Sequence, residues 1–98
     1  MKVKDIYLIE GRRWFSIFYG NTYHKVYIYK ICEKGKLLIA NSEESYGYDE
    51  MYKQTAFKLF QSNGYFKDMD YYGFLRLCRE NKGNFVFNVE DVNRRKDM

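Results

Sequence analysis

Apolar and polar residues alternate along the first forty residues, and this period of two predicts β-strands. β-branched and aromatic residues dominate these stretches, whereas Gly and Asn separate them. The sequence predicts turns at Glu10-Gly11, Gly20-Asn21 and Lys34-Gly35. The strands that these turns separate are Val3–Ile9, Arg12–Tyr19, Thr22–Cys32 and Leu37–Ala40.

The Gly20-Asn21 dipeptide predicts a two-residue hairpin turn of type II′, because glycine adopts the positive φ angle of the first central position without strain. Such a turn pairs Tyr19 with Thr22, and side chains then alternate between the two faces of the hairpin. One face carries Phe15, Ile17, Val26 and Ile28, and the other carries Trp14, Phe18, Tyr23, Tyr27 and Tyr29 with Arg12 and Lys25 among them.

The second half of the chain predicts two helices and one more strand. Apolar residues recur with helical spacing in residues 49–61 and 70–81, and Gly64 and Gly83 follow as helix stops. Residues 84–92 alternate again, and residues 93–98 predict a flexible basic tail. This order is typical of an α+β fold, here an antiparallel β-meander of about four strands followed by two helices and a C-terminal strand. We expect the first helix to cover the aliphatic face of the sheet.

The composition narrows the class of protein. A length of 98 residues suits one domain, which we expect to span residues 1–98. Twenty aromatic residues and 46% hydrophobic content exclude a disordered chain. The sequence has no apolar run long enough to cross a membrane, no apolar leader and only two cysteines. We therefore expect a soluble, cytoplasmic protein with no membrane partner.

The distribution of charge along the chain is more informative than the net charge of +4. Eight Lys and Arg residues against three acids make residues 1–40 basic, whereas six acids against three lysines make residues 41–70 acidic. Residues 71–98 carry six Lys and Arg residues against four acids. A basic first segment suits an anionic partner such as nucleic acid, although ordinary surface scatter would look similar.

Candidate catalytic and metal-binding groups are sparse. His24, Cys32 and Cys78 lack the spacing of a metal site, and both cysteines fall on predicted apolar faces. The acidic pairs fall in turns and at helix starts, and no phosphate-binding glycine loop is present. We expect no catalytic residues, no metal and no cofactor. A small enzyme that uses the acidic clusters or a thiol is a third hypothesis, behind two kinds of binding protein.

The aromatic and basic face of the predicted hairpin is the strongest candidate for a binding site. Flat rings stack on nucleic-acid bases while Arg and Lys neutralise phosphates. Tyr, Trp and Arg also dominate the energetics of protein interfaces, and an uncovered face would suit a second copy of the chain. Burial of the face under the second helix is the remaining alternative. The candidate binding residues are Arg12, Arg13, Trp14, Phe18, Tyr23, Lys25, Tyr27 and Tyr29.

Two stretches carry a resemblance to known proteins. The run Gly20-Asn21-Thr22-Tyr23-His24, and the run Tyr46-Gly47-Tyr48-Asp49 leading into Tyr52-Lys53-Gln54-Thr55-Ala56, resemble a group of small proteins encoded by bacteriophages and mobile elements. The resemblance covers about residues 12–62. It implies a non-enzymatic inhibitor of a host defence complex, such as an anti-CRISPR protein, acting in the host cytoplasm on a defence protein or ribonucleoprotein. The alternative is a nucleic-acid-binding protein of phage replication or regulation.

Overall fold

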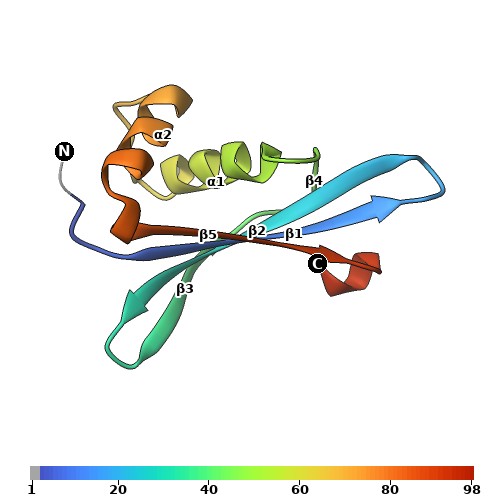
Figure 1. Cartoon of the computed structure of the whole chain (residues 1–98), viewed down its shortest axis with the longest axis horizontal. Helices are drawn as coiled ribbons and strands as arrows, with labels where there is room; N and C mark the ends of the chain where they lie inside the picture. Colours follow the sequence, from blue (N-terminus) through green and yellow to red (C-terminus); the bar gives the residue numbers. More distant parts are fainter. Residues whose placement is uncertain (1–2) are drawn as a thin grey trace.

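The computed structural model describes residues 3–98, which form an α+β fold with a mixed five-stranded sheet. The strand order is β3-β2-β1-β5, and the short β4 pairs with β2. Both α-helices lie on one side of the sheet, whereas the short C-terminal 3₁₀ turn (Arg95–Asp97) lies on the other side (Figure 1). The strands are β1 (Tyr7–Ser16), β2 (Asn21–Cys32), β3 (Gly35–Asn41), β4 (Ser45–Tyr46) and β5 (Phe85–Val92).

The turn predicted at Glu10-Gly11 is wrong, because β1 runs without interruption from Tyr7 to Ser16. Gly11 is needed for packing instead. A Cβ atom at Gly11 would lie 2.7 Å from Cδ2 and 2.9 Å from Cγ of Tyr52. Tyr52 comes from α1 and is 3% exposed, so its ring lies directly on the backbone of the strand.

The predicted register of the central hairpin is also wrong. β1 pairs with β2 so that Ser16 faces Asn21 and Trp14 faces Tyr23, which leaves residues 17–20 as a four-residue loop. The Gly20 N–H donates to the Ser16 carbonyl at 2.7 Å, and Gly20 has a φ angle of 69°. Glycine therefore ends a wider turn than the type II′ turn that the dipeptide indicates.

The last strand makes the sheet mixed and not a simple meander. β5 pairs with β1 in parallel, from Tyr7 opposite Phe85 to Trp14 opposite Val92. β1, β2 and β3 are antiparallel neighbours, as expected, and Cys32 faces Gly35 across the second turn. The α+β class holds, whereas the meander describes only this part of the sheet.

The helices α1 (Met51–Ser62) and α2 (Tyr71–Glu80) build the core on the covered face of the sheet. The predicted helical spacing is confirmed in both. Phe60 and Phe74 are almost completely buried and contact Phe85 of β5. Burial of such rings is the main source of stability in so short a chain. The other buried apolar residues of this core include Tyr7, Ile9, Val26, Ile28, Tyr52, Ala56, Phe57 and Leu77.

Candidate binding surface

The face of the sheet that turns away from the helices holds six of the eight predicted binding residues. Ile9, Val26 and Ile28 point to the core, so the residues between them on each strand point the opposite way. We call this side the outer face. All six are partly buried and none is sealed in the core. They are Arg12, Trp14, Tyr23, Lys25, Tyr27 and Tyr29.

Rings and cations alternate along the outer face. The rings of Trp14 and Tyr23 stack with centroids 6.0 Å apart, and Tyr46 meets Tyr23 edge-on at 6.0 Å. The Arg12 guanidinium lies 4.8 Å from the ring centre of Tyr27. Further along, the Lys36 ammonium lies 4.4 Å from the ring centre of Tyr29 (the register pairs Lys36 with Ile31). Such cation–π contacts orient both groups and hold the rings in place.

Glu10 lowers the positive charge of this face. Its carboxylate lies 3.6 Å from Arg12 and 4.0 Å from Lys36. The two cations that stack on tyrosine rings therefore share one anion. The outer face is thus more aromatic than basic, which favours a protein partner over the phosphates of a nucleic acid.

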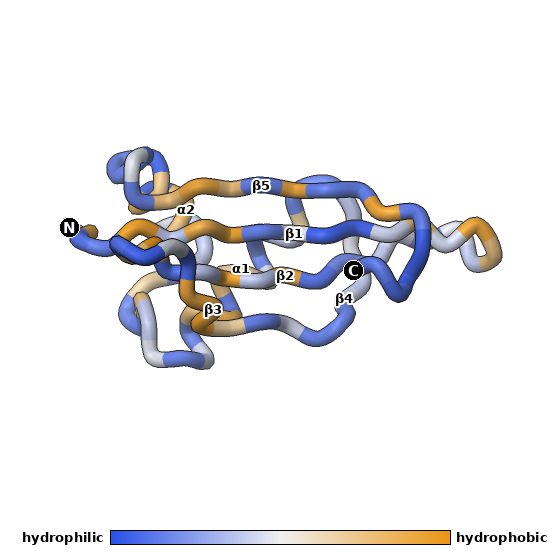
Figure 2. Tube along the Cα trace, turned by 90° about the horizontal axis from the view of Figure 1, so that it is seen from below, coloured by the Kyte–Doolittle hydropathy of each residue, from blue (hydrophilic) through white to orange (hydrophobic). Residues whose placement is uncertain are grey.

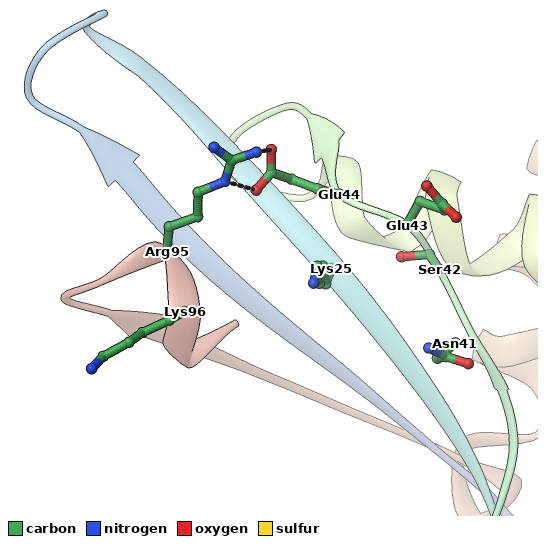
Figure 3. Close-up of a pocket in the computed structure, with 7 residues that line it drawn as sticks. All are labelled: Lys25, Asn41, Ser42, Glu43, Glu44, Arg95 and Lys96. Carbon is green, nitrogen blue, oxygen red and sulfur yellow. Dashed lines mark hydrogen bonds and ion pairs between the residues drawn. The ribbon is translucent and has the colours of Figure 1, made fainter.

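The C-terminal residues lie against this side of the sheet, where the sequence predicted a flexible tail. Arg95–Asp97 form a turn of 3₁₀ helix, and Met98 is buried. The Tyr27 hydroxyl donates to the Met98 carbonyl at 2.8 Å. The Arg95 guanidinium donates to both carboxylate oxygens of Glu44 at 2.8 and 2.9 Å (Figure 3). Figure 2 shows the segment crossing in front of β2.

An open hollow of about 830 Å³ lies between this segment and the loop after β3. Lys25, Arg95 and Lys96 line it together with Glu43 and Glu44, so cations and anions are mixed (Figure 3). The side chains around it come from β2, from the loop that follows β3 and from the C-terminal turn. The hollow therefore extends the outer face, and its mixed lining gives it no excess of charge of one sign.

Arg13 lies apart from the outer face. Its side chain belongs to the covered side of β1, beyond the start of α1, and donates to both oxygens of Asp91 at 2.8 and 3.1 Å. It also donates to the Asp49 carbonyl at 3.1 Å. The hydrogen bond to Asp91 raises the pKa of Arg13. Arg13 therefore joins the end of β5 to the loop before α1.

Phe18 also lies apart from the six, in the loop that joins β1 to β2, where it is 90% exposed. Its neighbours Ile17 and Tyr19 are 90% and 70% exposed, and Phe15 is 56% exposed. Sequence reasoning placed Phe15 and Ile17 on the covered face and so missed this cluster. The sequence does contain a sign of this exposed apolar cluster, because residues 14–23 include no Asp, Glu, Lys or Arg.

His24 is a structural residue in the interior of the fold. It is 1% exposed, its Nδ1–H donates to the Gly47 carbonyl at 3.1 Å, and its Nε2 accepts from the Thr55 hydroxyl at 2.6 Å. Burial lowers the pKa of His24, which favours the neutral ring. Both ring nitrogens are engaged, so the ring links β2 to α1 and to the loop before it.

The thiols offer no activated nucleophile near His24. Burial raises the pKa of Cys78 to about 12, and Cys32 is exposed at the far end of β2. Eight residues of strand separate Cys32 from His24, a distance of about 26 Å. Within residues 3–98, no three His, Cys, Asp or Glu side chains gather as ligands for a metal ion.

Comparisons with known proteins add no relative: no family model, no curated protein and no solved structure matches this chain. No helix among residues 3–98 is long and apolar enough to cross a membrane. The function must therefore be inferred from the geometry of the surface.

Proposed function

We propose that this protein is a non-enzymatic binding protein that inhibits a host complex which targets nucleic acids, in the manner of anti-CRISPR proteins. The outer face carries this proposal, because stacking and cation–π contacts order its rings and neither α1 nor α2 covers it (Figure 1). Rings that are already oriented lose little conformational entropy on binding, so their contact area contributes efficiently to affinity. The type of target follows from the resemblance to small phage proteins.

The ion pairs support a protein partner. Arg12 and Lys36 share Glu10, Arg13 pairs with Asp91, and Arg95 pairs with Glu44. A phosphate backbone would have to compete with each of these carboxylates. Interfaces between proteins instead use tyrosine, tryptophan and arginine at their centres.

The test mixes the purified protein with a purified CRISPR–Cas effector and its guide RNA. We expect co-elution in gel filtration and a loss of target cleavage. Tyr29→Ala removes one ring of the outer face, and we expect a loss of about 2 kcal/mol, which weakens binding about 30-fold. Tyr72→Ala is the control, because Tyr72 is 79% exposed on α2, on the opposite side of the sheet.

The result that contradicts the proposal is equal inhibition by both variants, because inhibition would then not depend on the outer face. Failure of the wild-type chain to bind any of a panel of effectors would remove the proposed type of target. Circular dichroism of each variant confirms that the fold is intact before binding is compared.

Direct nucleic-acid binding is the second candidate, favoured by the cations that lie over Tyr27 and Tyr29. The measurement is fluorescence anisotropy with a labelled single strand and a labelled duplex across a range of salt concentrations. Phosphate contacts predict an affinity that falls steeply as salt rises. A flat response or no binding excludes this function.

A further inference from the structure

The tip of the β1–β2 hairpin projects beyond the rest of the molecule (Figure 1). It carries the two most exposed large apolar side chains of the described residues, Ile17 and Phe18, each 90% exposed. Phe15 and Tyr19 add two more exposed side chains beside them. We call these four residues the hairpin tip. Single exposed apolar residues are common on protein surfaces, whereas a continuous cluster of this size marks a contact site.

Two backbone N–H groups of the hairpin loop, those of Tyr19 and Gly20, are satisfied from within. Ser16 is 2% exposed, and its hydroxyl accepts a hydrogen bond from the Tyr19 N–H at 3.2 Å. The Ser16 carbonyl accepts from the Gly20 N–H at 2.7 Å. A loop that enters an apolar environment needs such internal partners, because each unsatisfied polar group costs several kcal/mol there.

Polarity rises in steps from the tip toward the body. Behind the tip, Trp14 and Tyr23 face each other across the hairpin, and Tyr46 pairs with Tyr23. Tyr48, which is 57% exposed, lines a shallow hollow with Phe15 and Ile17. These aromatic residues form a belt of rings that carry polar atoms. Charged side chains begin level with the belt, because Arg13 and Asp91 line the same hollow as Tyr48, and the pair Arg95–Glu44 lies on the outer face.

We propose that the hairpin tip inserts shallowly into the interfacial region of a lipid bilayer. An apolar tip, a belt of Trp and Tyr and then charged groups reproduce the change in polarity from acyl chains through headgroups to water. At about 3.4 Å per residue the tip extends about 10 Å beyond Trp14, which matches the depth of interfacial insertion. A pocket in a protein would accept the apolar tip but would not require the aromatic belt.

Insertion of the hairpin tip is a separate contact from the one proposed for the outer face, and Trp14 and Tyr23 belong to both surfaces. It also departs from the sequence-based expectation of no membrane partner, which rested on the lack of an apolar span and had placed Ile17 on a covered face. A shallow contact of this kind needs no helix that crosses the bilayer.

The charges behind the tip set the type of membrane expected. The cations nearest the tip, Arg13 and Arg95, are each bound by both oxygens of a carboxylate. They therefore add little attraction for anionic headgroups. We expect the chain to bind zwitterionic phosphatidylcholine vesicles, with an affinity that changes less than threefold between 50 and 300 mM salt, in contrast to a contact driven by charge.

The experiment measures co-sedimentation of the full chain with phosphatidylcholine vesicles. Ile17→Asp/Phe18→Asp places two carboxylates at the tip, and we expect its partition coefficient to fall at least tenfold. Leu37→Asp/Leu38→Asp is the matched control. Leu37 and Leu38 are 59% and 47% exposed near the β2–β3 turn, where charged residues surround them. Thermal unfolding of both variants shows whether these exposed substitutions leave the core intact.

Retained binding by the control together with loss in the tip variant supports the proposal. Two results overturn it: no co-sedimentation of the wild-type chain at millimolar lipid, or equal loss in both variants. If the wild-type chain binds no vesicle but forms a dimer in the ultracentrifuge that the tip variant abolishes, the tip contacts a second copy. In that case the lipid proposal is wrong.

Discussion

Replacing Gly11 by alanine tests the close contact between α1 and the sheet. The added Cβ atom would lie 2.7 and 2.9 Å from two ring carbons of Tyr52, well inside van der Waals contact. The ring has little room to retreat, because Tyr52 is 3% exposed and meets the Phe87 ring at 6.4 Å. Overpacking of this kind costs about 1–3 kcal/mol. Loss of glycine entropy in the unfolded chain offsets about 0.4–1 kcal/mol of that cost.

We therefore expect Gly11→Ala to lower the free energy of unfolding by about 1–2 kcal/mol. Urea unfolding followed by the fluorescence of Trp14, the single tryptophan, measures this difference. In a domain of this size it corresponds to a decrease in Tm of about 4–15 °C. A change of less than about 0.5 kcal/mol would refute the packing argument, since that is the usual effect of a surface substitution.

Gly83→Ala provides the matched control. No atom lies within 4 Å of the Cβ position at Gly83, and its φ angle lies outside the positive range that side chains avoid. The same gain of one methyl group should be neutral there or slightly stabilising. Equal destabilisation by both substitutions would show that the cost at Gly11 does not come from Tyr52.

Three further predictions concern buried and capping groups. Burial lowers the pKa of His24 below its ordinary 6.5, so at mildly acidic pH this side chain binds more protons in the unfolded chain than in the folded one. The free energy of unfolding should therefore fall as the pH drops below about 6.5. Urea unfolding from pH 5 to 8 measures this change, and the His24→Gln variant should lack it. Maleimide should label the exposed Cys32 and leave the buried Cys78 unmodified until denaturant is added; two adducts by mass spectrometry on the folded chain would contradict that burial. Asp70→Ala removes the acceptor of the Gly73 N–H at the start of α2 and should cost about 0.5–2 kcal/mol in thermal unfolding, with Asp68→Ala as the control.

Local patterns predicted the elements better than their pairing. Both helices follow from the spacing of apolar residues, because one buried face is enough to require a period of 3.6. Gly11 was misinterpreted because a glycine between two strand-like runs indicates a turn, whereas here it accommodates a ring from α1. That contact joins residues 41 positions apart, and no local pattern records it.

The residues of the outer face were predicted correctly although the predicted register of the hairpin was wrong. The predicted turn paired Trp14 with Tyr27, whereas Trp14 faces Tyr23 in the structure. The difference of four residues is even, so each side chain stayed on its expected face. A shift by an odd number would have exchanged the two faces. Ile17 and Phe18 were the exceptions, since both lie in the loop. Arg13 was included among the binding residues although the alternation already placed it on the same side as Phe15, where the structure has it.

The parallel pairing of β5 with β1 could not be predicted from local sequence. Residues 84–92 alternate as an edge strand should, but alternation does not state the neighbour or the direction. The neighbour and direction of β5 depend on where the chain emerges after its two helices have covered the sheet.

This pairing has a consequence for the order in which the protein assembles in the cell. Partners across β1 and β5 are 78 positions apart in the chain, from Tyr7 with Phe85 to Trp14 with Val92. During translation β1 leaves the ribosome long before β5 has been synthesised. Until then the edge of β1 that will pair with β5 has unpaired backbone groups. Such distant contacts form slowly. The nascent chain is therefore most prone to aggregate in this interval, which ends when β5 emerges and pairs with β1.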